Sequence, residues 1–150
     1  LGFNYRMTDV EAALGLSQLQ KLPGFLEKRN TLAAHYDERF ASKENISPLK
    51  QSNNRYSSYH LYVVRASGLT RKEHAFVVEQ LRDKGVFAHL HYIPIHCQPY
   101  YKNQGFKIGD FPNAERYYEQ AITLPLYPEL TRDQIDFIVD TLSFTLDNLN

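Results

Sequence analysis

Three segments of the chain carry apolar residues at helical spacing, and each one opens with the same hydrogen-bonding signal. A threonine stands three residues before a Glu or Gln, so its hydroxyl can accept from the backbone N–H of that residue, whose side chain can accept from the threonine N–H. The three threonines are Thr8, Thr70 and Thr131. They predict helices over residues 8–41, 70–85 and 131–149.

The first helical segment is interrupted by the pair Pro23-Gly24. Because proline has no N–H to donate inside a helix, we expect a kink or a restart at this point. The segment is therefore either one long kinked helix or two stacked helices. Its leucines are expected to pack into the core, with a seam against a partner helix as the alternative; they are Leu14, Leu19, Leu22 and Leu26.

Runs of β-branched and aromatic residues predict three strands, over residues 58–65, 86–92 and 121–126. The polar stretch 42–57 reads as a loop with room for a short strand, and a short helix is expected over 112–120. The predicted fold class is α/β: a small two-layer domain of about three strands packed by helices, with a long N-terminal helix. A sheet this small leaves edges that another domain or subunit would have to cover.

Composition narrows the class of protein. The chain has 150 residues, with 17 Lys and Arg against 17 Asp and Glu, so bulk charge does not favour a nucleic-acid or membrane-surface binder. A single cysteine excludes an internal disulfide, and no apolar run is long enough to span a membrane. With no signal-peptide pattern at the front, the expected location is cytoplasmic. Because the chain begins at Leu1 and its one methionine is Met7, we expect a piece of a longer protein.

Four of the six histidines gather in two of the predicted strand regions and just after them, at His60, His89, His91 and His96. The spacing of the last three is compatible with a zinc or iron site, while the alternative is a polar, aromatic-walled cleft. We favour the cleft, because no carboxylate or cysteine stands at a matching spacing. Cys97 is a possible ligand or thiolate, although a lone cysteine is more often a small buried apolar residue.

Two further groups of side chains suit a ligand. Asn4, Tyr5 and Arg6 stand just before the Thr8 cap, where free N–H groups and a guanidinium favour an anion; an exposed arginine beside an asparagine turn is the alternative. The tyrosine pairs at 100–101 and 117–118 could stack on a base or a sugar, or simply pack. The chain has no glycine-rich phosphate loop and no nucleophile elbow.

Four segments in this order resemble motifs of one family, the DegT/DnrJ/EryC1/StrS sugar-nucleotide aminotransferases. They are GFNYRMTDVEAALGLSQL at 2–19, YHLY at 59–62, GVFAHLHYIPIH at 85–96 and LPLYPELT at 124–131. Together they extend over nearly the whole chain. Within the family they are most similar to the branch that aminates a UDP-linked 4-keto-6-deoxy-N-acetylhexosamine, as in pseudaminic acid biosynthesis.

The resemblance implies the C-terminal domain of a fold-type I aminotransferase that depends on pyridoxal 5'-phosphate (PLP) and transfers an amino group, from L-glutamate, to a 4-keto nucleotide sugar. It implies a connecting helix region over 1–41 and a small α/β domain over 42–150. The Schiff-base lysine is expected before Leu1, so no catalytic residue is expected in this chain, which alone should be inactive. The parent is expected to be a homodimer.

The resemblance also assigns binding roles to single positions. Asn4 matches the asparagine that reaches the PLP phosphate of the other subunit. Arg6 matches an arginine that holds the carboxylate of the donor or a substrate phosphate, and Tyr5 shapes the wall beside it. The residues implied for the nucleotide-sugar cleft are His91, Tyr92 and His96. The Pro23-Gly24 pair departs from the family pattern.

Two other functions remain open on the sequence. The chain could be a non-catalytic sugar-binding, dimerisation or regulatory domain of the same family. It could also be a metal enzyme built on His89, His91 and His96, although no metal is expected on our preferred interpretation.

Overall fold

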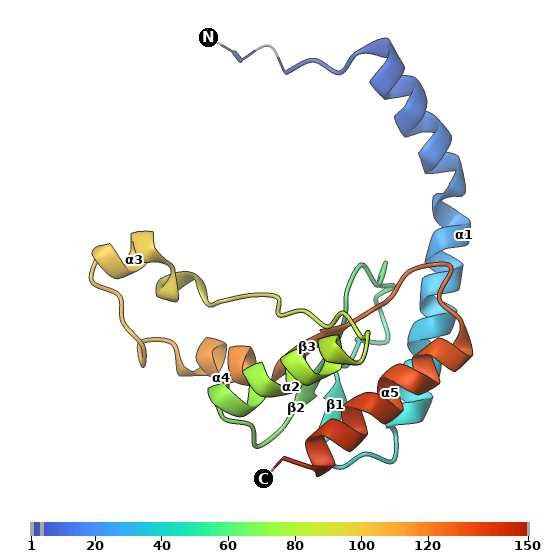
Figure 1. The fold of residues 1–150 in the computed structure, drawn as a ribbon. Coiled ribbons are helices and arrows are strands. Elements are labelled where there is room, and N and C mark those ends of the chain that lie inside the picture. The colour runs from blue at the N-terminus through green and yellow to red at the C-terminus, as the bar shows by residue number, and fades with distance from the viewer. Residues whose placement is uncertain (1, 4, 150) are drawn as a thin grey trace.

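The computed structural model describes residues 2–3 and 5–149. A long helix leads into a small sheet with helices packed on it, and an extension carrying a short helix projects from the sheet (Figure 1). The elements, in order, are α1 (Asp9–Phe40), β1 (Ile46–Pro48), β2 (Tyr62–Ala66), α2 (Arg71–Asp83), the short 3₁₀ helix η1 (Ile95–Cys97), α3 (Pro99–Asn103), α4 (Pro112–Gln120), β3 (Ala121–Leu124) and α5 (Arg132–Asp147).

The three predicted capping boxes all form, and they fix the starts of α1, α2 and α5. At α2, for example, the Glu73 carboxylate accepts from the N–H of Thr70 at 2.7 Å, and the Thr70 hydroxyl accepts from the N–H of Glu73 at 3.3 Å. These are contacts between near neighbours in sequence, which is why the sequence alone locates the helix starts well.

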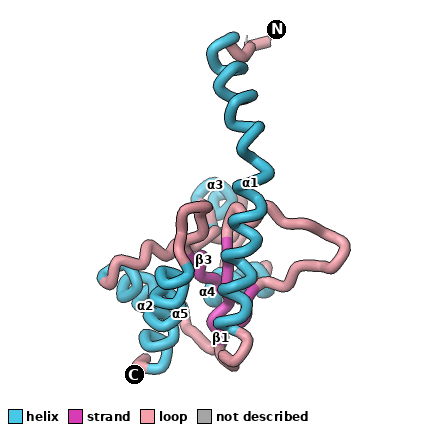
Figure 2. Tube along the Cα trace, turned by 90° about the vertical axis from the view of Figure 1, so that its right-hand side faces the viewer, coloured by secondary structure: helices cyan, strands magenta, loops and turns pink. Residues whose placement is uncertain are grey.

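The first helix runs without a break through Pro23, so the alternative of two stacked helices is wrong. It is gently curved in Figure 1, and its N-terminal half stands clear of the rest of the molecule in both Figure 1 and Figure 2. From Asp9 to Gly24 every side chain is exposed. The buried residues lie in the second half: Leu32, Ala33, Tyr36 and Phe40.

The sheet is antiparallel, in the order β1-β2-β3. In the pairing of β2 with β3, Tyr62 lies opposite Leu124, and in that of β1 with β2, Ile46 lies opposite Ala66. The strands predicted over 58–65 and 121–126 are thus confirmed in place, with shifted ends. Pro48 lies in an edge strand, where its missing N–H costs no interior ladder bond.

The strand predicted over 86–92 is wrong, and β1 supplies the third strand instead. The backbone N–H of Val86 bonds to the Leu81 carbonyl, and that of Ala88 bonds to Val86. These local bonds, which follow the end of α2, use donors that a ladder would need. Within residues 86–92, all of which the structure describes, only His89 pairs with β3, in a single bridge to Thr123.

The core lies between the sheet, the second half of α1, and α2 and α5, with α5 in contact with both other helices. Tyr36 anchors it: its ring stacks on Tyr62 at 4.5 Å between centroids, and its hydroxyl donates to the Pro125 carbonyl at 2.9 Å. Tyr62, the first residue of β2, donates its hydroxyl to the carboxylate of Asp37 in α1 at 2.6 Å. Within the described residues, no helix is both long and apolar enough to cross a membrane.

Candidate functional site: an aromatic pocket

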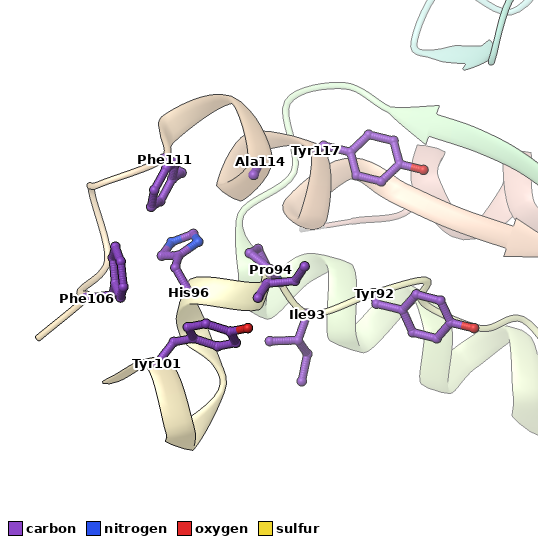
Figure 3. A pocket seen from close by; sticks show the side chains of 10 residues that line it. Tyr92, Ile93, Pro94, His96, Tyr101, Phe106, Phe111, Ala114 and Tyr117 are labelled. Carbon is purple, nitrogen blue, oxygen red and sulfur yellow. The ribbon is translucent and has the colours of Figure 1, made fainter. Parts of the chain in front are cut away.

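A cavity of about 560 Å³ lies between α4 and the segment that precedes it (Figure 3). We call it the aromatic pocket. Its walls are mainly aromatic and aliphatic, which suits the flat or apolar face of a ligand better than a free charge. The lining residues are Tyr92, Ile93, Pro94, Ile95, His96, Tyr101, Phe106, Phe111, Ala114 and Tyr117.

One wall of the pocket is formed by residues 93–111, which we call the aromatic arm. The arm contains η1 and α3 and projects away from the sheet (Figure 1). Its rings contact one another in series. The ring centroid of His96 lies 4.8 Å from that of Phe111, and the centroid of Phe106 lies 6.1 Å from that of Phe111 and 6.2 Å from that of Tyr101. The opposite wall is α4, through Ala114 and Tyr117.

A carboxylate joins the two walls. The Nε2 atom of His96, which is 6% exposed, lies 2.8 Å from Oε1 of Glu115 on α4. The same carboxylate accepts from the backbone N–H groups of Gly109, at 2.8 and 2.9 Å, and Phe111, at 3.3 Å. Burial alone would raise the pKa of Glu115, but the hydrogen bonds from Gly109, His96 and Phe111 outweigh it and hold that pKa below its usual 4.5.

His91 is outside the lining of the aromatic pocket, next to the lining residue Tyr92. Its Nδ1 lies 2.8 Å from the Thr123 hydroxyl, and its ring meets Tyr92 edge-on at 4.6 Å. Desolvation, with the charges of His89 and His60, lowers the pKa of His91 below its usual 6.5. At neutral pH the imidazole is therefore neutral, able to exchange hydrogen bonds with an uncharged polar group.

Cys97 does not form a nucleophile relay with its histidine neighbour. Its Sγ lies 3.4 Å from Nε2 of His96, the same nitrogen that meets Glu115. A relay needs the two ring nitrogens for two different partners, one for the thiol and one for the acid. Cys97 is half-buried and packs as a small side chain.

The histidines predicted as a possible metal site are dispersed by these contacts. The rings of His89 and His91 are 6.1 Å apart, while His96 faces Glu115. In the part of the chain that the structure describes, no group of three or more His, Cys, Asp or Glu side chains is placed to hold a metal ion.

The N-terminal candidates are not brought to this pocket. Asn4 lies outside the described residues. Tyr5 is 92% exposed and stacks on Phe3 at 5.7 Å, and Arg6 is exposed as well. The segment lies beyond the free end of α1, apart from the aromatic arm in both views (Figure 1 and Figure 2).

Sequence reasoning found part of the pocket. Tyr92 and His96 were predicted to line a cleft, and Tyr101 and Tyr117 came from the tyrosine pairs considered as stacking residues. It missed Phe106, Phe111 and above all Glu115. No local pattern links Glu115 to His96, because 19 residues separate them and only the fold of the arm brings them together.

Comparisons with known proteins place this chain in a family. The model of the DegT/DnrJ/EryC1/StrS aminotransferase family matches residues 1–143. The spore coat polysaccharide biosynthesis protein SpsC of Bacillus subtilis is 35% identical over 148 residues, which covers 94% of this chain and 37% of SpsC. The UDP-4-amino-4,6-dideoxy-N-acetyl-beta-L-altrosamine transaminase of Campylobacter jejuni is 34% identical over 151 residues, which covers 99% of this chain and 39% of the transaminase.

One further relative is named as a regulatory protein, and one solved structure has the same fold. A pleiotropic regulatory protein of Geobacillus stearothermophilus is 31% identical over 147 residues, covering 95% of this chain and 38% of that protein. Spr1654 of Streptococcus pneumoniae in its PLP form superposes with a TM-score of 0.90 at 34% identity, covering 97% of this chain and 37% of that one. The chain thus spans between 37% and 39% of the length of these three relatives. Because the family model matches residues 1–143 of this chain, the chain belongs to the DegT/DnrJ/EryC1/StrS aminotransferase family.

Proposed function

We propose that this chain is the C-terminal part of a PLP-dependent aminotransferase that moves an amino group from L-glutamate to C4 of a UDP-linked 4-keto-6-deoxy-N-acetylhexosamine. The observation that carries the proposal is the 34% identity, over 99% of this chain, to a transaminase named for a 4-amino-4,6-dideoxy sugar nucleotide. The amino group replaces the keto oxygen of the sugar, and L-glutamate leaves as 2-oxoglutarate. The reaction would serve the synthesis of a surface polysaccharide or glycan in the cytoplasm.

The pocket supports a role in holding the sugar nucleotide. Tyr92 and His96 bring aromatic faces to its lining, and His91 offers a neutral imidazole next to Tyr92. Aromatic rings suit the apolar faces of a sugar or a base, while a neutral imidazole suits a hydroxyl. We assign these three residues to substrate binding, together with Tyr5 and Arg6 from the N-terminal segment.

The aromatic pocket does not form a PLP site by itself. The lining of the aromatic pocket includes no lysine, and the imidazole of His96 is already engaged by Glu115. A phosphate needs several N–H or cationic donors, which these walls do not present. We therefore assign PLP mainly to the region that the relatives carry beyond this chain, with Asn4 as a contact from a second subunit. When bound, PLP supplies the electron sink for amino transfer.

We assign residues 1–41 to a connecting region and 42–150 to a small domain. The exposed half of α1 then has a function, because a homodimer of the longer protein could cover it. A helix with apolar side chains on more than one face is stable when it is covered on more than one side. The 150-residue chain alone should not catalyse the reaction.

The test uses the complete product of the gene that encodes these 150 residues. It is incubated with the UDP-4-keto-6-deoxy-N-acetylhexosamine and L-glutamate, and the amino sugar and 2-oxoglutarate are followed by mass spectrometry. We expect the two products in equal amounts, and the visible absorbance of bound PLP in the purified protein. A protein that binds PLP yet aminates no 4-keto sugar nucleotide would contradict the substrate.

A substitution tests the N-terminal binding residues. Arg6→Gln should raise KM for L-glutamate or for the sugar nucleotide at least tenfold, because a bidentate cation is lost. Lys21→Gln, also on the exposed part of the chain, is the matched control and should change KM less than twofold. Equal changes in KM for the two variants would contradict the assignment of Arg6 to substrate binding.

A second candidate function is regulation without catalysis, which the 31% identity to the pleiotropic regulatory protein favours. It predicts a complete protein that lacks the Schiff-base lysine and shows no PLP absorbance. The aminotransferase proposal predicts the lysine and the absorbance. The same purified protein therefore decides between the two.

A further inference from the structure

The aromatic arm has almost no core of its own. Pro94 and His96 at its base are buried, but every side chain from Gln98 to Phe111 is exposed. Among the described elements, α3 packs chiefly on η1, its neighbour in the chain. Hydrophobic burial therefore cannot fix where the outer part of the arm lies, and specific polar contacts must do so.

Those contacts converge on one side chain outside the arm. Glu115 accepts from the backbone N–H of Gly109, the backbone N–H of Phe111 and the ring nitrogen of His96. The three donors span the arm from its base to its end. Glu115 itself is on α4, which packs against β2 and α2 and is therefore fixed to the body of the domain.

The position of Glu115 links these bonds to the pocket. Its neighbour Ala114 and, two residues on, Tyr117 form the α4 wall, while Phe111 and His96, which Glu115 binds, belong to the arm wall (Figure 3). We infer that Glu115 is a positioning residue that holds the aromatic arm against α4 and so sets the width of the aromatic pocket.

The contact depends on a carboxylate, not merely on a side chain of this size. The N–H of Gly109 meets both oxygens, at 2.8 and 2.9 Å. In a glutamine one of these atoms becomes an NH₂ donor, so it would face an N–H donor instead of accepting from it. Gly109 has φ +99°, a conformation that favours glycine, so the chain here is shaped to aim this N–H.

Other charged and titratable groups lie near the carboxylate and must be controlled for. His96 faces it from η1, and Cys97 contacts the same ring nitrogen of His96. Asp110 lies in the arm next to Gly109 and accepts from the backbone N–H of Lys107. A smaller cavity next to Glu115 also brings in Arg71 from α2, Lys102 from α3, and Tyr118 and Glu119 from α4. Among the described residues, the side chain of Glu119, one turn along the same helix, makes no hydrogen bond or ion pair, so Glu119 is the matched control.

The first experiment is hydrogen exchange on the 150-residue chain, with amides resolved by NMR. In Glu115→Gln we expect exchange at Gly109 and Phe111 to be at least tenfold faster than in the wild type, with the amides of β3 unchanged. In Glu119→Gln we expect rates within twofold of the wild type. The Gly109 amide shift should titrate in the wild type with a midpoint below 4.5, and its change with pH should be much smaller in Glu115→Gln.

Unchanged exchange in Glu115→Gln, or equal acceleration in Glu119→Gln, would overturn the inference. If Glu115→Gln unfolds the sheet as well, Glu115→Asp takes its place: the shorter carboxylate should release Gly109 and Phe111 while β3 stays protected. Protection retained in Glu115→Asp would overturn the inference too.

The consequence for catalysis rests on the proposed function. In the complete protein, Glu115→Gln should raise KM for the sugar nucleotide at least tenfold with kcat within twofold, because the pocket wall is displaced and the reacting centre is not. A KM that stays unchanged while exchange shows the arm released would overturn the assignment of this pocket to the sugar nucleotide, and would leave the role of Glu115 in placing the arm standing.

Discussion

The two halves of α1 belong to one unbroken helix but relate differently to the rest of the molecule. From Asp9 to Gly24 every side chain is exposed, including large apolar ones such as Leu16 and Leu19, each at least 60% exposed. In the second half, Tyr36 and Phe40 are almost fully buried against the sheet and α5. Apolar content alone therefore does not distinguish the halves, and what differs is whether this chain supplies a surface to cover them.

The distribution of apolar residues around the exposed half carries a second lesson. At about 100° per residue, Val10 and Leu14 lie on one face, while Leu16 and Leu19 lie on the opposite face. A surface helix with one neighbour has a single apolar stripe. Two opposite apolar faces indicate contact on two sides, as the proposed longer dimeric enzyme would provide.

The largest expected effect comes from a core truncation in the buried half. Phe40→Ala should lower the free energy of unfolding by about 3–5 kcal/mol, because a buried ring is replaced by a cavity. Leu16→Ala, in the exposed half, should change it by less than about 0.5 kcal/mol. Urea unfolding followed by circular dichroism measures both, and similar losses in the two variants would end the distinction between the halves.

The second largest effect is expected at alkaline pH, which should lower the free energy of unfolding through tyrosines buried around the second half of α1. Desolvation by burial raises the pKa of Tyr36 and of Tyr62 far above the usual 10.0, so both stay neutral in the folded state. Their contribution is complete below pH 10 and is lost as pH rises above it, by up to about 1.4 kcal/mol per pH unit for each residue. Unfolding curves at pH 9 and pH 11 show the loss, and Tyr62→Phe should make it smaller. An equal loss in that variant would rule out Tyr62 as a source.

Helix caps give a smaller and more selective comparison. Thr131→Ala should cost about 1 kcal/mol, because it removes the cap of α5, which is packed in the core. Thr8→Ala removes the same type of cap from the exposed end of α1 and should leave the midpoint of global unfolding unchanged, since that end contributes little to the cooperative unit. Thermal unfolding of the two variants decides the matter: equal shifts would mean that the two ends belong to one cooperative unit.

The smallest effect on unfolding is expected for polar replacements on the exposed half. Leu16→Ser with Leu19→Ser should leave the unfolding free energy of this chain nearly unchanged, because neither side chain is buried. The same pair should weaken the subunit association of the complete protein, measured by sedimentation, if that half is an interface. A complete protein whose association is unaffected would remove the interface proposal.

How far the sequence predicted the structure depended on the distance between the interacting residues. The helix starts at Thr8, Thr70 and Thr131 follow from bonds over three residues, and they were predicted correctly. The strand over 86–92 has a suitable composition, yet it failed because Val86 and Ala88 donate locally after α2. Composition does not reveal which donors are already used.

The pocket shows the same limit at the site. Tyr92 and His96 stand in a recognisable segment, and the sequence marked them. Glu115 was not marked, because its three arm donors become neighbours only when the arm folds back onto α4. Family resemblance identified the protein class, while the structure identified the side chain that organises the pocket.

The most direct test of the difference within α1 is amide hydrogen exchange along that helix, measured in the 150-residue chain and in the complete protein. In the chain we expect strong protection for residues 30–40 and fast exchange for residues 9–22; in the complete protein we expect both halves to be protected. Strong protection of residues 9–22 in the chain alone, or fast exchange of that half in the complete protein, would contradict the account.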